Sequence, residues 1–187
     1  MAKRFDGVTG ELRAFIEAQH LFFVATAPSG AQGRVNLSPK GLDSLRVLDE
    51  RTVAYLDFVG SGVETIAHLR ENGRIALMFC AFAGPPNIVR LHGRGEAVEP
   101  PDARFAALSK RFAPAPGARA VIVVRVERAS DSCGYGVPLF SYEGERTQLA
   151  AWAAKKGADG LTRYQHDKNA RSIDGLPGLR WVGETGE

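Results

Sequence analysis

Two adjacent runs of β-forming residues constrain the fold more than any other feature of this sequence. Residues 74–82 read RIALMFCAF and are apolar at every position after the arginine, which is typical of a strand buried on both faces. Residues 87–98 instead alternate apolar with polar or charged side chains, as in a strand with one exposed face. The segment Gly84-Pro85-Pro86 between them marks a turn. The two runs therefore predict a central antiparallel hairpin.

Other segments extend this pattern into a turn-rich fold. Further strands are predicted at 21–27, 34–37, 52–58 and 120–129, and short helices at 9–20, 63–72, 101–113 and 147–156. Asn72-Gly73 is expected to end the second of these helices. The 21 glycines and 10 prolines favour many turns over a helical bundle. No GxGxxG motif follows a strand, so a doubly wound dinucleotide fold is disfavoured. We expect a mainly β fold, an antiparallel barrel decorated by helices.

Size and charge narrow the class of protein further. The 187 residues are 44% hydrophobic, enough to build one core, and no internal repeat is evident. We expect a barrel domain at 1–142 and, at 143–187, a helix and tail packed on the barrel or on a partner subunit. The net charge of +3 is spread along the chain, so nucleic-acid binding is not implied.

Targeting and metal-binding signals were also sought in the sequence. We find neither a signal-peptide pattern nor a run long and apolar enough to cross a membrane. Cys80 and Cys133 lie far apart and have no second Cys or His at the spacing of metal ligands. We therefore expect no disulfide framework and no metal site, and a cytoplasmic location.

The turn that follows strand 52–58 is the strongest local signal for a ligand. Ser61, Gly62 and Thr65 combine a glycine turn with a helix start, where free N–H groups favour a phosphate. However, Ser61 and Glu64 also fit a capping box, which satisfies the same N–H groups internally and places a carboxylate there. The segment alone favours capping.

A second candidate is the basic segment RVNLSPK at 34–40. Arg34 and Lys40 are an even number of residues apart, so in an extended chain both cations reach the same side and one phosphate. Pro39 weakens that inference, and a solvated strand edge is the alternative. Asn36 offers an amide to a ring edge, and Ser38 offers a hydroxyl.

Two weaker candidates remain beside these. Arg90, His92 and Arg94 share one strand face, where they would meet an anion or simply water. Tyr135 lies between glycines and would either stack on a planar ligand or belong to a tight turn. We find no Ser-His-Asp arrangement, so no catalytic residue is assigned.

Together, the segments 34–41, 55–79 and 88–99 resemble the pyridoxamine 5′-phosphate oxidase-like flavoproteins in order and spacing. The tail segments AWAAKKG at 151–157 and KNARSIDGLPGL at 168–179 are similar to the closing segments of a bacterial branch of that family. The resemblance implies a split β-barrel, usually a homodimer, with FMN bound where the subunits meet.

The resemblance also implies roles for individual residues. The cations of Arg34 to Lys40 would bind the FMN phosphate, backbone near Asn36 and Leu37 would meet the flavin ring, and a second phosphate segment falls on Leu56 to Thr65. In this context phosphate binding is favoured over capping. The expected cofactor-binding residues are Arg34, Val35, Asn36, Leu37, Ser38, Lys40, Leu56, Asp57, Ser61, Gly62, Thr65 and Arg90.

Two departures from the family pattern bear on the reaction. The oxidase itself has an Arg-Lys pair after the turn serine, where this chain has Gly62-Val63-Glu64, which puts phosphate affinity in doubt. The tail ends GLRWVGETGE and lacks the Arg-Leu motif that holds pyridoxamine phosphate. We therefore expect an FMN-dependent oxidoreductase that exchanges a hydride through flavin N5 with a small molecule other than pyridoxamine phosphate.

Three alternatives stay open at this point. One is a flavin-binding or redox-sensing protein without turnover. The others keep the barrel but bind a deazaflavin or haem, both used by relatives of the fold. The sequence leaves open the substrate, the electron donor, and whether Tyr135 or Trp152 touches a ring.

Overall fold

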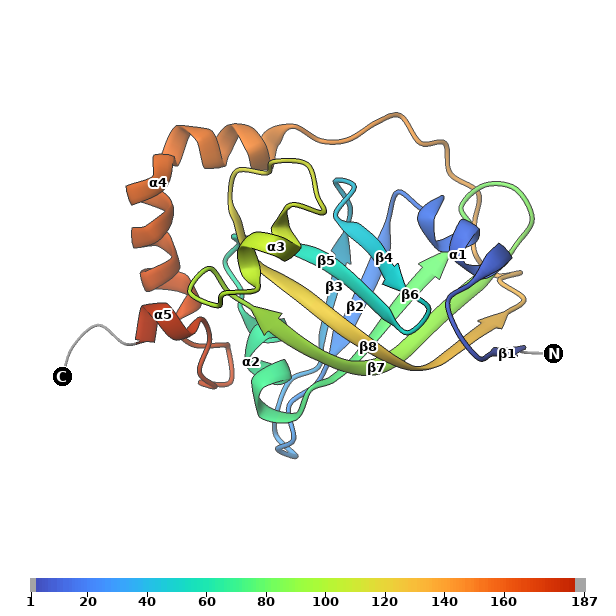
Figure 1. Ribbon diagram of the computed structural model, residues 1–187, viewed down its shortest axis with the longest axis horizontal. Coiled ribbons are helices and arrows are strands. Elements are labelled where there is room, and N and C mark those ends of the chain that lie inside the picture. The colour runs from blue at the N-terminus through green and yellow to red at the C-terminus, as the bar shows by residue number, and fades with distance from the viewer. Residues whose placement is uncertain (1–2, 184–187) are drawn as a thin grey trace.

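A computed structural model describes residues 3–183 and is built around one antiparallel sheet (Figure 1). The strands follow in the order β3-β2-β6-β7-β8-β5-β4, with β1 paired to β8. Their bounds are Arg4–Phe5 (β1), Phe22–Thr26 (β2), Asn36–Lys40 (β3), Leu45–Asp49 (β4), Thr52–Phe58 (β5), Arg74–Cys80 (β6), Ile88–Val98 (β7) and Ala118–Ser132 (β8). The end strands β3 and β4 do not pair within the described residues, which leaves the barrel open on one side. The expected mainly β split barrel is confirmed.

The β6–β7 hairpin lies at the centre of the sheet, as its sequence predicted. Leu77 of β6 faces Leu91 of β7, and both side chains are fully buried. A bulge follows His92, and a Cβ at Gly93 would overlap the Arg125 carbonyl oxygen of β8. Glycine is therefore required where β7 and β8 approach closely.

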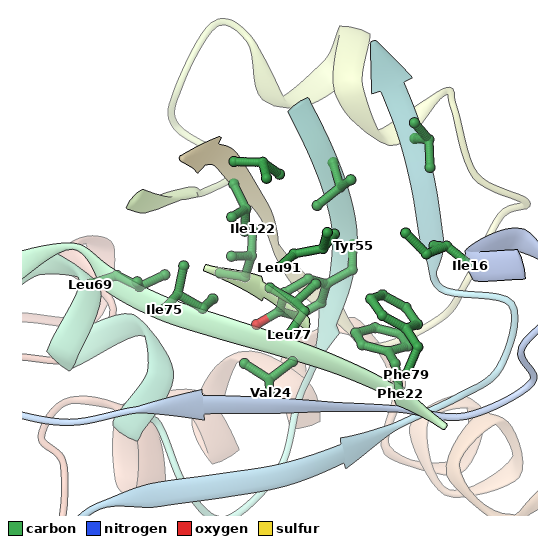
Figure 2. Close-up of a cluster of buried hydrophobic side chains, with 14 of the residues drawn as sticks. Ile16, Phe22, Val24, Tyr55, Leu69, Ile75, Leu77, Phe79, Leu91 and Ile122 are labelled. Carbon is green, nitrogen blue, oxygen red and sulfur yellow. The ribbon is translucent and has the colours of Figure 1, made fainter. Parts of the chain in front are cut away.

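Large apolar side chains fill the interior of the barrel (Figure 2). The ring of Phe22 contacts those of Tyr55 and Phe79, with centroids 5.6 and 5.7 Å away. Helix α1 (Gly10–Glu17) adds Leu12 and Ile16 to this core. A smaller cluster lies on the other face of β5 and packs against α3 (Phe105–Ser109).

Helix α2 (Glu64–Asn72) follows β5 directly and packs against β7 and β2. It ends where the sequence predicted, at Gly73, which has a φ of 69°. Its N-cap is Val63, and no side chain caps the helix start. The capping box of Ser61 and Glu64 therefore does not form, and that interpretation is wrong.

Several elements differ from the sequence prediction. Strand β4 was missed, α3 is shorter than expected, and β3 extends through Pro39. Proline is tolerated there because, among residues 3–183, β3 pairs with β2 alone and its other edge is free. Helix α4 (Gln148–Asn169) is twice as long as predicted and breaks at Gly157, which has a φ of 66°.

The C-terminal part of the chain wraps around the barrel. After β8 the chain runs along the upper side of the molecule to reach α4, and α5 (Arg180–Gly183) lies beside the lower end of α4 (Figure 1). Leu179 and Val182 insert into the main core. No described helix is both long and apolar enough to span a membrane. The last residues of the predicted tail, 184–187, lie outside the described part.

Candidate functional site

An open groove of about 630 Å³ lies where three chain segments meet, and we call it the β3 groove. Its walls are the start of β3, the turn between β5 and α2, and a hairpin at 171–177 that follows α4. The volume falls within the range of small-molecule sites, roughly 300–1,000 Å³. The lining residues are Arg34, Val35, Asn36, Leu37, Ser61, Gly62, Glu64, Arg171, Ser172 and Ile173.

The first wall is an edge strand whose side chains alternate. Val35 and Leu37 point outward and are 75% and 63% exposed, while Asn36 is half-buried. Because β3 pairs only with β2, its second backbone edge has no strand partner among the described residues. This wall therefore offers apolar surface and unpaired peptide groups, which suit a planar ring with polar edges.

A buried hydrogen-bond network holds this strand against α2. Asn36 Nδ2 donates to Thr65 Oγ1 at 3.0 Å, and Ser38 Oγ donates to Asn36 Oδ1 at 3.1 Å. Behind them, Thr26 Oγ1 lies 2.9 Å from Nδ1 of His68, which is fully buried. Burial lowers the pKa of His68, so the ring is neutral at pH 7. The network fixes β3 and occupies the side chains of Asn36 and Thr65.

The second wall is the turn after β5. Ser61 is exposed at the tip of the turn. Gly62 packs against the carboxylate of Glu64, and a Cβ at position 62 would overlap that carboxylate. Glu64 Oε1 also accepts a hydrogen bond from the Ile173 N–H at 3.1 Å. A carboxylate thus lies at the start of α2, so a phosphate would bind beside the helix end and not on its axis.

The third wall is the C-terminal hairpin, which an ion pair joins to β3. Arg34 Nη1 lies 2.6 Å from Asp174 Oδ1, and the Arg34 backbone N–H donates to Asp174 Oδ2 at 2.7 Å. The backbone hydrogen bond from Arg34 and its guanidinium lower the pKa of Asp174. The Arg34 side chain is still 66% exposed, so it can meet a further anion.

Lys40 lies away from the groove, in a buried charge cluster. Lys40 Nζ and Arg119 Nε each donate to one oxygen of Asp57, both at 2.8 Å. Burial of Asp57 raises its pKa, but Arg119 and Lys40 outweigh this, and the net pKa is below the ordinary value. The cluster links β3 to β5 across the open side of the barrel.

The predicted ligands therefore fall into three groups. Arg34, Val35, Asn36, Leu37, Ser61 and Gly62 line the groove, Ser38 and Thr65 belong to the network beneath it, and Lys40, Leu56, Asp57 and Arg90 lie elsewhere. Leu56 belongs to the smaller apolar cluster, and Arg90 donates to Ser132 Oγ at 2.9 Å. The role of each residue as a ligand stays a prediction.

Two aromatic residues that the sequence left open lie in separate places. Tyr135 is 82% exposed in the chain beyond β8, and Trp152 packs edge-on against Tyr164 within α4. Neither lines the groove. Within residues 3–183, no group of three or more His, Cys, Asp or Glu is placed to hold a metal ion.

The hairpin wall of the groove is not evident from the sequence. Arg171, Ser172 and Ile173 line it and Asp174 holds Arg34, yet none was singled out as a ligand. Their segment was noted only for its family-like motif. No periodic pattern reveals that a hairpin far along the chain folds back onto β3.

Comparison with known proteins gives the class to which this fold and groove belong. The family model described as pyridoxamine 5′-phosphate oxidase matches residues 8–133. The pyridoxamine 5′-phosphate oxidase family protein ustO of Aspergillus flavus is 41% identical over an alignment of 195 residues. The alignment covers 94% of this chain and 77% of that protein. The chain belongs to the pyridoxamine 5′-phosphate oxidase family.

Solved structures share the fold. The crystal structure of HupZ from Group A Streptococcus is 28% identical with a TM-score of 0.55, covering 71% of this chain and 98% of that one. The FAD-binding protein from Mycobacterium smegmatis is 14% identical with a TM-score of 0.50, covering 70% of this chain and 97% of that one. At this identity the second likeness shows the fold alone.

Proposed function

We propose that the protein is a cytoplasmic FMN-dependent oxidoreductase that exchanges a hydride with a small molecule other than pyridoxamine phosphate. One observation carries the proposal: the β3 groove sets the free edge of β3 beside the exposed guanidinium of Arg34 and the turn of Ser61 and Gly62. The ring system would lie along β3, and the phosphate between Arg34 and the turn. Membership of the family supports a flavin.

The residues present fit such a cofactor. A guanidinium has five N–H donors, and within the described residues the side chain of Arg34 uses only Nη1, toward Asp174. Ser61 is exposed, and its hydroxyl has no hydrogen bond to the described residues. Val35, Leu37 and Ile173 give the groove apolar surface for a planar ring.

Bound FMN would supply the hydride chemistry at N5, and the chain would supply position and environment. The bond from Asn36 to Thr65 fixes the strand that meets the ring. The exposed apolar side chains of this wall would exclude water from the ring face once it is covered. No residue is assigned a catalytic role.

The C-terminal part of the chain supports a substrate other than pyridoxamine phosphate. We propose that 143–187 is a unit added to a barrel of 1–142, whose hairpin completes the groove. Leu179 and Val182 are buried in the chain's own core, and the Arg180 N–H donates to Glu99 Oε2 at 2.9 Å. This stretch, which lacks the Arg-Leu motif that the oxidase uses to hold pyridoxamine phosphate, therefore packs within the chain's own fold.

We also propose a homodimer with the cofactor at the subunit interface. The groove is open on its outer side, where Val35, Leu37 and Ile173 are largely exposed. A second copy would cover this apolar surface and enclose the ring. The sequence resemblance implies the same assembly.

A second candidate function is flavin binding without turnover. The groove carries two cations, Arg34 and Arg171, and two carboxylates, Glu64 and Asp174 at its rim. Among residues 3–183, its lining includes no His, Cys or Tyr that could exchange a proton with a substrate. Such a site would bind a flavin as a redox sensor. A deazaflavin or haem in the same groove remains the other alternative.

The test is a visible spectrum of the purified protein with and without FMN, after gel filtration removes unbound ligand. We expect flavin bands that elute with a dimer, followed by turnover with a reductant and electron acceptors. Retained flavin that never turns over would favour the sensor, and an intense Soret band would indicate haem. Complete loss of FMN would refute the proposal, and Arg34→Ala tests the phosphate contact.

A further inference from the structure

We propose that Arg171 is the second cation that binds the flavin phosphate, in place of the Arg-Lys pair that this chain lacks after Ser61. The inference rests on the proposed FMN site and adds to it a residue beyond the stretch matched by the family model, 8–133. It also assigns a purpose to the C-terminal hairpin, which carries this arginine across to the groove.

Arg171 is placed to meet a ligand in the β3 groove. It lines the same groove as Arg34, Ser61 and Gly62, and it is exposed. Its Nη1 donates to the Gly175 carbonyl oxygen at 2.9 Å, within the hairpin itself. No other hydrogen bond to its guanidinium occurs in residues 3–183, so most of its donors are free for an anion.

The hairpin is built to hold Arg171 in place relative to the turn. Asn169 is fully buried, and its Nδ2 donates to the Gly60 carbonyl oxygen at 2.9 Å, next to Ser61. Gly178 packs so closely that a Cβ there would overlap the Asn169 carbonyl oxygen. A bridge between Arg171 and Pro177 closes the hairpin.

Contacts at the tip of the hairpin fix it from the other side. The Ile173 N–H donates to Glu64, and Asp174 binds both the backbone and the side chain of Arg34. The hairpin is therefore joined to both other walls of the groove. The backbone that carries Arg171 is therefore ordered before an anion binds, so binding costs less entropy than it would for an arginine on a loose segment.

Other nearby cations are already engaged. Lys40 is paired with the buried Asp57. Arg70 is paired with Glu99, and the side chains of these two residues are 17% and 7% exposed, respectively. The cations that line the groove are Arg34 and Arg171, and the carboxylates near them, Glu64 and Asp174, each accept a backbone N–H. A phosphate therefore has two guanidinium groups as its charged donors.

The experiment compares FMN with riboflavin, which has the same ring but no phosphate, on wild type and Arg171→Ala. Dissociation constants come from flavin fluorescence titration. We expect Arg171→Ala to weaken FMN binding roughly 10- to 100-fold, as for the loss of a charge-assisted hydrogen bond, and to leave riboflavin within about twofold. Arg163→Ala, which removes an exposed cation of α4 outside the groove, is the matched control and should change neither.

The outcomes separate this inference from the proposed function. If wild type binds neither flavin, both fail. If wild type binds FMN and Arg171→Ala binds it equally well, or loses FMN and riboflavin alike, the FMN site stands and the role of Arg171 is refuted. Arg171→Lys, which keeps the charge, should recover part of the FMN affinity without affecting riboflavin.

Discussion

At the scale of single residues, the most consequential side chain outside the groove is Asp57. It is fully buried and balances two cations, Lys40 and Arg119. Removing one member of a buried charge cluster leaves the others uncompensated, which costs about 3–5 kcal/mol. We therefore predict that Asp57→Asn lowers the free energy of unfolding by about that amount at pH 7, measured by urea denaturation.

The control for this prediction is an ion pair at the surface. Glu96 pairs with Arg104, and both side chains are about half exposed, at 51% and 54%. Glu96→Gln should therefore cost at most about 1 kcal/mol. Equal losses for Asp57→Asn and Glu96→Gln would contradict the assignment of Asp57 as a buried counter-ion.

His68 makes a prediction about pH. Burial lowers the pKa of His68, and this effect outweighs the nearby carboxylates of Asp174, Glu64 and Glu71, which raise it. As the pH falls, the imidazole of the unfolded chain is therefore protonated first, near pH 6.5. Titration of His68 therefore has no effect on the free energy of unfolding above about pH 6.5, and it lowers that free energy as the pH falls further. We predict that His68→Gln flattens the loss of unfolding free energy between pH 7 and 5, measured by urea denaturation at each pH.

At the scale of elements, periodicity explains which parts of the fold the sequence reveals. The bounds of β5 and the hairpin of β6 and β7 follow from apolar and alternating runs. Strand β4 was missed because it is only five residues long, LRVLD, and Leu48 breaks the alternation after Val47, its one buried residue. The second half of α4 was missed because its buried side chains, Gln165 and Asn169, are polar.

The candidate site likewise combines features that the sequence predicts with features that only the tertiary structure reveals. The residues of β3 and of the turn after β5 were predictable because each segment is local in sequence and carries a family pattern. The pairing of Lys40 with Asp57, and of Arg34 with Asp174, arises from tertiary contacts between distant segments. Parity along the strand allowed one phosphate for both cations and the family resemblance favoured it, whereas the structure places the two cations in separate environments.

The C-terminal hairpin supplies the prediction at this scale. Because a Cβ at Gly178 would overlap backbone of Asn169 and crowd Val63, Gly178→Ala must displace the hairpin. We expect a loss of about 1–3 kcal/mol in unfolding free energy, and weaker FMN binding, since the third wall moves. Gly30→Ala, where nothing lies within 4 Å of the added carbon, should stay within about 0.5 kcal/mol. A stable Gly178→Ala variant with unchanged FMN affinity would show that the position of the hairpin does not matter for FMN binding.

At the scale of the whole molecule, the open side of the barrel and the groove share the edge strand β3. Lys40 and Asp57 span the opening from within, while the outer side of β3 presents Val35 and Leu37. A free strand edge with exposed apolar side chains is a surface that proteins usually cover. A second copy of the chain would cover it and enclose the ring of a bound flavin.

This proposed assembly leads to the last prediction. Leu37→Asp places a charge on the outer side of β3, where the side chain is 63% exposed, so the fold should tolerate it while the dimer should not. We expect a monomer by sedimentation and weaker FMN binding. Leu139→Asp is the matched control, because Leu139 is 74% exposed in the segment between β8 and α4, away from the groove. A Leu37→Asp dimer with normal FMN affinity would show that the cofactor does not need a second subunit at β3.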